Sequence, residues 1–212
     1  MHEDALNPEV MRRKPQQARA IKRVNKILAA AEGLFAQVGY EAASTNAIAA
    51  RAQTSIGSLY RFFPDKEALL KALAERYIEQ MHETFSQVHH SPEVLDLPLS
   101  DYIDRIMREF EAFIRANPGY RAVFVESLAA SASVQAMDAD LCSQVAEELA
   151  EFYRRKAPHL SRDQTELMAL VVVEVARNLR RLSLTRDAQF QQQVAGELKK
   201  LLLAYLQPYL GK

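Results

Sequence analysis

Cysteine is almost absent from this 212-residue sequence, in which Cys142 stands alone. An intramolecular disulfide framework is therefore excluded. Charged residues interrupt the first 14 positions, so no secretory leader is recognisable and we expect a cytoplasmic protein. The longest wholly apolar run, residues 167–173, lies between Glu166 and Glu174. This run is far shorter than the ~20 residues of a membrane span, so we expect no membrane partner.

Glycine and proline are also scarce, with six and eight residues respectively. Together they reach about half of the usual ~12% share, which favours few turns and long regular elements. No segment alternates apolar and polar residues as a half-buried strand does, whereas apolar residues recur at intervals of three and four along most of the chain. The sequence therefore predicts an all-α fold of about nine helices.

Net charge is absent overall, because 27 basic residues match 27 acidic ones, but the two signs are unevenly distributed. Between residues 10 and 66 there are ten basic and three acidic residues, whereas from residue 67 onward there are 17 basic and 21 acidic residues. A basic N-terminal part on a mildly acidic remainder is typical of a nucleic-acid-binding head. A solvated basic face without that role would give the same count, so charge alone does not decide.

The N-terminal part is predicted to form three helices. The first has an apolar stripe over residues 24–38 at the 3.6-residue period, and Gly39 ends it because glycine adopts positive φ at little cost. The other two are short; one buries Leu59 and Phe63 and stops at Pro64. The N-cap candidates are Ser44 and Thr45 for the second helix, and Thr54 and Ser55 for the third.

Two short helices joined by a tight turn are typical of a helix-turn-helix, whose second helix enters the DNA major groove. Residues 44–70, STNAIAARAQTSIGSLYRFFPDKEALL, resemble the signature of TetR-family transcriptional regulators in the leading Thr, the Ile-Ala pair and Gly-x-Leu-Tyr-x-x-Phe-x-x-Lys. The resemblance covers about residues 24–73. We therefore predict a DNA-binding helix-turn-helix head with a basic N-terminal arm over residues 1–64, and a helical bundle for ligand binding and dimerisation over residues 65–212.

One position departs from the family pattern. The turn between the two short helices usually reads Ala-Gly-Val, and here it reads Ala52, Gln53 and Thr54. Holding Gln53 at positive φ would cost roughly 1 kcal/mol, which a packed head can absorb.

The DNA contacts follow from residue type and position. Thr45, at a helix start, offers a hydroxyl and free backbone N–H groups to a phosphate, and Lys66 adds a full charge at the start of the fourth helix. Arg61 is placed to reach guanine O6 and N7. The resemblance implies that Tyr60 reaches a phosphate and that Ile56 is exposed, where it meets a thymine methyl. The predicted DNA-binding residues are Arg12, Arg13, Lys14, Arg23, Thr45, Thr54, Ser55, Ile56, Gly57, Ser58, Tyr60, Arg61 and Lys66.

Each of these assignments has a plainer alternative. Thr45 could be an N-cap only, Tyr60 a partly buried core residue, and Arg61 a contact to phosphate alone. Gly57 could serve helix packing rather than a close approach to DNA. The arm at residues 12–14 could be a solvated tail, and Arg23, one turn after Arg19, could be exposed and idle.

The C-terminal part combines aromatic residues in its middle helices with apolar stripes in its last two. The resemblance assigns a homodimer interface to the last two helices, at Leu167, Val171, Val175, Leu198, Leu202 and Tyr205; an intramolecular core is the alternative. A small, largely apolar effector is predicted among Phe110, Phe113 and Phe124, with Glu174 or Asn178 as polar anchors. The alternatives are core packing of the aromatic rings and a surface pair between Glu174 and Arg177.

Nothing in the sequence indicates an enzyme. The five histidines form no His-x-x-x-His pair, no glycine-rich phosphate loop occurs, and no base neighbours Cys142 in sequence, so we expect no metal and no cofactor. We predict a ligand-responsive repressor that binds a palindromic operator in double-stranded DNA as a dimer and is released by its effector. A structural or division-related DNA-binding protein without an effector is the alternative.

Overall fold

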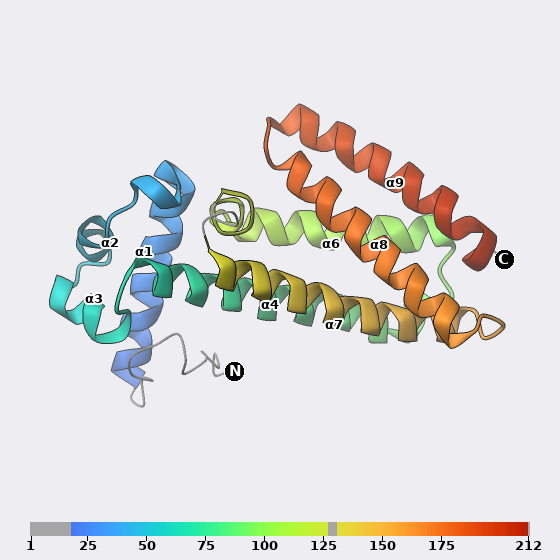
Figure 1. The fold of residues 1–212 in the computed structure, drawn as a ribbon, viewed down its shortest axis with the longest axis horizontal. Helices are drawn as coiled ribbons and strands as arrows, with labels where there is room; N and C mark the ends of the chain where they lie inside the picture. The colour runs from blue at the N-terminus through green and yellow to red at the C-terminus, as the bar shows by residue number, and fades with distance from the viewer. Residues whose placement is uncertain (1–17, 127–130, 212) are drawn as a thin grey trace. The chain divides into compact units, whose positions relative to one another are not determined.

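The computed structural model describes residues 18–126 and 131–211, and within these ranges every regular element is a helix (Figure 1). This confirms the predicted all-α class. The chain divides into two compact units, Met1–Glu79 with Asn117–Asp138, and Gln80–Ala116 with Ala139–Lys212. The predicted boundary at residue 64 separates a DNA-binding part from a ligand-binding part, and it stays a prediction. The compact units are divided differently, since residues 65–79 and 117–138 belong to the same unit as the N-terminal helices.

The first unit contains the three helices of the head and parts of two long helices that continue into the second unit. Its elements are α1 (Ala18–Ala42), α2 (Thr45–Arg51), α3 (Ile56–Phe62), the start of α4 (Lys66–His90), the π-helix η1 (Ala122–Glu126) and the start of α7 (Ala132–Lys156).

Helix α1 follows its predicted stripe for most of its length. Its buried apolar residues include Ile27, Leu28 and Phe35, but Val38, expected on the same stripe, is 46% exposed. The reason is the chain direction beyond it, because Gly39 lies at φ 78° and ψ 166° and kinks the helix there. This region of backbone space is essentially restricted to glycine, which explains the residue that the sequence has at this point.

A partly buried carboxylate, that of Glu32, joins α1 to α4 inside the first unit. Glu32 accepts a hydrogen bond of 2.7 Å from the Tyr77 hydroxyl and forms an ion pair of 2.7 Å with Arg76. Tyr77 also packs on Phe124 of η1, with ring centroids 6.4 Å apart. A Cβ added at Gly119 would lie 2.6 Å from the Tyr77 hydroxyl oxygen, so a side chain there would displace the tyrosine. These contacts hold α1, α4 and the segment before η1 in one arrangement.

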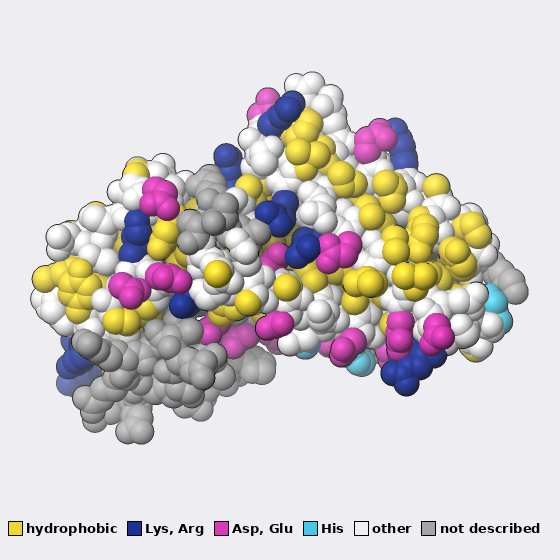
Figure 2. Space-filling view, viewed as in Figure 1, with side chains coloured by type: hydrophobic (Ala, Val, Ile, Leu, Met, Phe, Trp, Pro, Cys, Tyr) yellow, Lys and Arg dark blue, Asp and Glu magenta, His cyan; other side chains and the backbone are white. Residues whose placement is uncertain are grey.

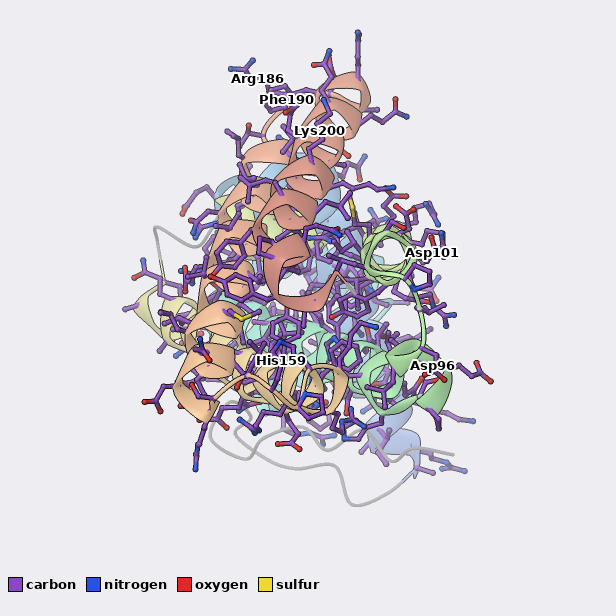
Figure 3. All side chains as sticks on the ribbon, turned by 90° about the vertical axis from the view of Figure 1, so that its right-hand side faces the viewer. Asp96, Asp101, His159, Arg186, Phe190 and Lys200 are labelled. Atoms are coloured by element: carbon purple, nitrogen blue, oxygen red, sulfur yellow. The ribbon has the colours of Figure 1, made fainter. Side chains whose placement is uncertain are left out.

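The second unit is a bundle of long helices. Its elements are the end of α4, α5 (Pro92–Leu95), α6 (Leu99–Ala116), most of α7, α8 (Arg162–Ser183) and α9 (Ala188–Leu210). Helix α9 packs on both α8 and α6. At the start of α9 the Arg186 guanidinium lies 4.5 Å from the centroid of the Phe190 ring, and both residues are labelled together in the side view (Figure 3). No helix of the described residues has the length and apolar character needed to span a membrane.

An aromatic cluster with one histidine fills the core at the end of α4. His89 is buried, its Nε2 lies 3.0 Å from the Tyr102 hydroxyl, and its ring packs on Phe152 with centroids 5.3 Å apart. Burial lowers the pKa of His89 to about 4, and the positive charges of His90 and Arg155 act in the same direction. The folded protein therefore keeps this imidazole neutral down to about pH 4.

This burial makes the stability of the protein depend on pH. Because the unfolded chain protonates His89 below about pH 6.5 and the folded chain only below about pH 4, acidification through this window favours unfolding. We expect the free energy of unfolding to fall by about 3 kcal/mol across the window and to level off below it. The measurement is urea denaturation at a series of pH values. His89→Gln should lose this component, while His90→Gln, at the exposed neighbour, should retain most of it because burial is the main cause of the lowered pKa of His89. Identical pH profiles for all three proteins would contradict the assignment.

Candidate nucleic-acid interface

Hydroxyl side chains start both short helices of the head. Ser44 Oγ accepts a hydrogen bond of 3.2 Å from the Ala47 N–H, and Ser55 Oγ accepts one of 3.2 Å from the Ser58 N–H. Of each predicted pair, one residue is therefore the N-cap: Ser44 for α2 and Ser55 for α3. Thr45 is the first helical residue of α2, so the alternative that it serves as an N-cap does not hold.

The turn between α2 and α3 has the strained residue that the sequence predicts. Gln53 lies at φ 51°, the only positive φ of a non-glycine among the described residues. Backbone hydrogen bonds of 3.0 Å from Gln53 N–H to Ala50 C=O and from Thr54 N–H to Ala49 C=O close the turn. Lys26 of α1 also donates to Gln53 Oε1 at 3.3 Å. Lys26 was not identified from the sequence, since a lysine 27 positions before the turn carries no local signal.

One side of helix α3 is buried in the core of the head and the other side is exposed. Leu59 and Phe63 are fully buried, as predicted, and Phe62 is buried with them. On the opposite side, Ile56 is 36% and Tyr60 is 40% exposed. The alternative of a core tyrosine therefore does not describe Tyr60, and the side of α3 away from the core is available to a partner.

Two predicted DNA contacts lie together on this surface. The hydroxyl oxygens of Thr45 and Tyr60 are 3.0 Å apart, so the start of α2 and the exposed side of α3 present adjacent hydroxyl groups. The Arg23 guanidinium of α1 approaches Ser58 Oγ at 3.5 Å, and it is exposed. Side chains from all three helices of the head thus contribute to one polar surface.

Gly57 and Arg61 complete the exposed side of α3. A Cβ added at Gly57 would meet no atom within 4 Å, so helix packing does not require glycine there. The missing side chain instead leaves room for a close approach from outside the protein. The Arg61 guanidinium lies 5.0 Å from the centroid of the Phe62 ring, is exposed, and is the basic residue in the last turn of α3.

Lys66 has a structural role that the sequence did not indicate. Its Nζ donates hydrogen bonds of 2.8 Å to the Tyr40 carbonyl and 3.0 Å to the Glu41 carbonyl, and it lies 4.3 Å from the centroid of the Tyr40 ring. The lysine thereby satisfies carbonyl groups at the end of α1. A phosphate contact by Lys66 stays a prediction. The predicted arm residues Arg12, Arg13 and Lys14 lie outside the described residues.

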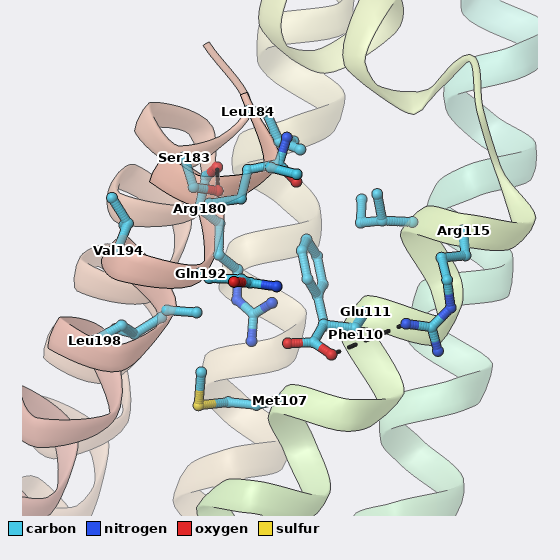
Figure 4. Close-up of a pocket in the computed structure, with 14 residues that line it drawn as sticks. Met107, Phe110, Glu111, Arg115, Arg180, Ser183, Leu184, Gln192, Val194 and Leu198 are labelled. Atoms are coloured by element: carbon cyan, nitrogen blue, oxygen red, sulfur yellow. Dashed lines mark hydrogen bonds and ion pairs between the residues drawn. The ribbon is translucent and has the colours of Figure 1, made fainter. Parts of the chain in front are cut away.

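The residues predicted to bind an effector are not gathered at one place. Phe110 and Phe113 lie in the second unit, with ring centroids 6.4 Å apart, whereas Phe124 lies in the first unit and packs on Tyr120 at 4.9 Å. Phe110 lines a pocket of about 410 Å³ between α6, α8 and α9 (Figure 4).

The two predicted polar anchors do not line that pocket. Glu174 pairs with Arg177 at 2.8 Å, and Asn178 Nδ2 donates to the Glu174 carbonyl at 2.8 Å. The plainer alternative, a pair between Glu174 and Arg177, is the arrangement observed. Asn178 is anchored to the preceding turn of its own helix.

The predicted dimer residues divide into exposed and buried sets. Leu198 and Leu202 are 1% and 7% exposed and pack in the core of the second unit, so the alternative of an intramolecular role holds for them. Leu167 is 61% exposed on α8, and Val171, Val175 and Tyr205 are half-buried. Leu170 and Leu201 are exposed as well, and apolar side chains gather over α8 and α9 on the face seen in Figure 2.

An all-α chain with two capped short helices, a tight turn and an exposed side on the second helix has the architecture of a helix-turn-helix protein. Two family models match it: "Bacterial regulatory proteins, tetR family" over residues 27–73 and "Tetracyclin repressor-like, C-terminal domain" over residues 98–206. The chain belongs to the TetR family.

Individual relatives are similar either over a short stretch of the chain or at low sequence identity over most of it. The "HTH-type transcriptional repressor KstR" of Rhodococcus jostii (strain RHA1) is 40% identical over 60 residues, which is 28% of this chain and 28% of that protein's length. A solved TetR-family transcriptional regulator from Streptomyces coelicolor is 29% identical, with a TM-score of 0.63, over 89% of this chain and 99% of that one. Salmonella enterica GusR, 22% identical, has a TM-score of 0.67 over 91% of this chain and 100% of that one, a similarity of fold.

The strained turn predicts that a glycine substitution changes the stability of the protein in opposite directions at two nearby positions. Gln53→Gly should raise the free energy of unfolding by up to about 1 kcal/mol, because glycine adopts positive φ without a Cβ clash. Ala50→Gly, at an exposed helical position of α2, should lower it by about 0.5–1 kcal/mol. Thermal and urea denaturation of the two variants beside the parent protein measure both signs. Equal destabilisation by the two glycines would show that Gln53 is not strained.

Proposed function

We propose that the protein is a transcriptional repressor that binds a palindromic operator in double-stranded DNA as a homodimer and is released by a small ligand. The observation that carries the proposal is the exposed side of α3, where Ile56, Gly57, Tyr60 and Arg61 are free of the core that holds the opposite side. A recognition helix needs this division, because one side anchors the helix while the other enters the major groove.

The residues on this surface have different roles in the proposal. Arg61 reads a guanine through O6 and N7, and Ile56 contacts a thymine methyl group. Thr45, Tyr60 and Arg23 bind phosphates and set the position of α3 in the groove. Gly57 allows the backbone of α3 to come close to the bases. The phosphate contacts supply affinity for any duplex, and the base contacts supply sequence preference.

The proposed dimer follows from the limited sequence specificity of a single head. Helix α3 has seven residues, so a single head distinguishes few base pairs. Two heads related by twofold symmetry read two half-sites about one helical turn, ~34 Å, apart. The exposed leucines on α8 and α9 support a dimer surface there, because clustered exposed apolar side chains are typical of interaction sites.

Release by a ligand is a shift between two states of the dimer. A ligand that prefers a conformation in which the heads no longer match the half-site spacing lowers operator affinity by the ratio of its affinities for the two states. Helix α4 starts in the first unit and ends in the second, and α1 is fixed to its first half through Glu32, Arg76 and Tyr77. We infer that α4 transmits the state of the second unit to the head.

The DNA contacts can be separated by two arginine substitutions. After an operator is selected from a random duplex pool, Arg61→Ala should weaken its binding by about 1–3 kcal/mol and relax the preference at one base of each half-site. Arg23→Gln should weaken all duplexes alike and reduce the slope of log K against log salt by about one per head. Fluorescence anisotropy at several salt concentrations measures both effects.

Arg105→Gln is the matched control, because Arg105 is an exposed arginine of α6 paired with Glu109 in the second unit. It should leave operator binding unchanged. If Arg61→Ala and Arg23→Gln also bind as the parent does, the proposed interface is wrong. Occupancy at many unrelated genomic sites, with no change in reporter output on ligand addition, would instead favour a structural DNA-binding protein.

The dimer surface can be tested by placing a charge on it. Leu167→Glu should bury an unpaired carboxylate at the interface and shift the protein to monomers at micromolar concentration. Val38→Glu is the control, since Val38 is also exposed but lies in the first unit, and this variant should remain dimeric. Sedimentation equilibrium distinguishes the two forms. A monomeric parent protein, or a dimeric Leu167→Glu, would rule out the interface at α8.

A further inference from the structure

Exposed basic residues lie along one side of the first half of α1. Their spacing of three, four and seven positions places them on a single side of the helix. These residues are Arg19, Lys22, Arg23 and Lys26. Within the described residues no carboxylate pairs with any of them, and the next acidic residue, Glu32, pairs with α4 instead. Because like charges one turn apart repel each other, this side of α1 is suited to bind an anion.

Two of these cations reach the helix-turn-helix. Arg23 approaches Ser58 Oγ of α3 at 3.5 Å, and Lys26, three positions further along α1, donates to Gln53 Oε1 at 3.3 Å. Gln53 lies in the turn, two residues before the N-cap of α3. The basic side of α1 therefore continues to the start of the proposed recognition helix, and the first turns of α1 lie beside α3 (Figure 1).

The pair of Lys26 and Gln53 offers only hydrogen-bond donors to a partner. The Gln53 side chain has one acceptor atom, Oε1, and Lys26 binds it. Two N–H groups of the Gln53 amide and two of the Lys26 ammonium remain, and no residue in the described part of the chain accepts from them. Both side chains are exposed, and together they carry one positive charge. A phosphodiester matches this arrangement, because it is an anion whose free oxygens only accept hydrogen bonds.

The backbone of Gln53 supports a functional role independently. Its φ of 51° is strained for a residue with a Cβ, and glycine would adopt it without strain. Strained residues are typical of functional sites, where the rest of the structure holds them in place. Glycine at this position would relieve the strain, but it would leave no amide beside the ammonium of Lys26.

We infer that Lys26 and Gln53 form a further phosphate-binding site of the head, in which the ammonium and the amide together hold one phosphate of the DNA backbone beside the start of α3. Neither residue is among the DNA contacts predicted from the sequence. The site positions the recognition helix and reads no base, so it acts on every duplex alike. It rests on the proposed function, because its ligand is a phosphate of bound DNA.

Removal of the charge at Lys26 tests the site on the full-length protein with the selected operator. Lys26→Gln should lower operator affinity by about three- to tenfold at about 0.15 M salt, and reduce the slope of log K against log salt by about one per head. Lys26→Arg keeps the charge and should retain the slope of the parent, and Arg105→Gln should change neither quantity. A slope for Lys26→Gln equal to that of the parent would overturn the inference.

Substitutions at Gln53 separate DNA binding from stability. Gln53→Glu keeps the length of the side chain, the strain and the contact with Lys26, but it replaces the amide donors with acceptors and cancels the charge. Operator affinity should therefore fall by about tenfold or more. Gln53→Gly should bind the operator about threefold more weakly even though its free energy of unfolding rises. A purely structural glutamine would not give opposite changes, so a Gln53→Gly that binds as tightly as the parent would overturn the inference.

Val38→Glu is the matched control for the added charge. Val38 is an exposed residue of the same helix, 12 positions after Lys26, and therefore about 18 Å from it along α1. This distance exceeds the screening length of about 8 Å at 0.15 M salt, so the variant should bind the operator within about twofold of the parent. A loss as large as that of Gln53→Glu would show that the effect is one of net charge and would overturn the inference.

Neutral methylphosphonates, placed in turn at each backbone position of the operator, locate the contact. At the phosphate that the pair holds, this change should weaken binding of the parent and leave binding of Lys26→Gln unaffected, because the variant has already lost the attraction. Equal weakening of both proteins at every position would overturn the inference. Operator binding that depends on Arg61 but not on Lys26 removes this site alone, whereas a parent protein that binds no duplex contradicts the proposed function as well.

Discussion

The head depends on one constraint, which is that a seven-residue helix is not stable by itself in water. Helix α3 is held by a serine cap at its start and by the burial of Leu59, Phe62 and Phe63 along one side. Because that side is committed to the core, the other must face outward. The exposure of Ile56 and Tyr60, and with it the proposed recognition of DNA, is therefore a consequence of how the helix is stabilised.

The arrangement of α1 and the first half of α4 depends on an electrostatic constraint. Glu32 is mostly buried, and a carboxylate in that position costs free energy unless it is paired. Arg76 and Tyr77 supply the pairing from consecutive positions of α4, with one ion pair and one hydrogen bond, each of 2.7 Å. Any movement of α4 relative to α1 that breaks both contacts leaves the carboxylate of Glu32, whose side chain is only 15% exposed, without these partners. The cost of that movement favours motion of α1 and the first half of α4 as one body.

Much of the head could be predicted from the sequence because its signals are local. The N-caps, the helical period and the glutamine at position 53, where the family usually has glycine, are each recognised from residues within a few positions of one another. The all-α class follows from the same local patterns. The positive φ of Gln53 is confirmed on those grounds. The end of the stripe at Gly39 was predicted, but the exposure of Val38 was missed because the helical period does not show whether a neighbouring element covers the last turn before the kink.

The contacts that were missed join distant parts of the sequence. Lys66 binds carbonyls 25 and 26 positions earlier, and Arg180 stacks on a ring 70 positions earlier. Neither pairing has a spacing that a single sequence reveals. The apolar residues of α9 show the same limit. Leu198 and Leu202, four positions apart on one side of the helix, are buried in the core, whereas the neighbouring Leu201 is exposed. Periodicity shows that a helix has an apolar side but not which neighbour covers it.

Gly39 shows how much of the architecture can depend on an atom that is not there. The kink at this residue turns the chain from the long stripe of α1 toward Tyr40 and Glu41, whose carbonyl groups Lys66 binds. Its φ and ψ are open to glycine because there is no Cβ to collide with the backbone. Inspection of side-chain contacts would pass over this position. The route from the first helix of the head to the second is nevertheless set there, by the absence of a single carbon atom.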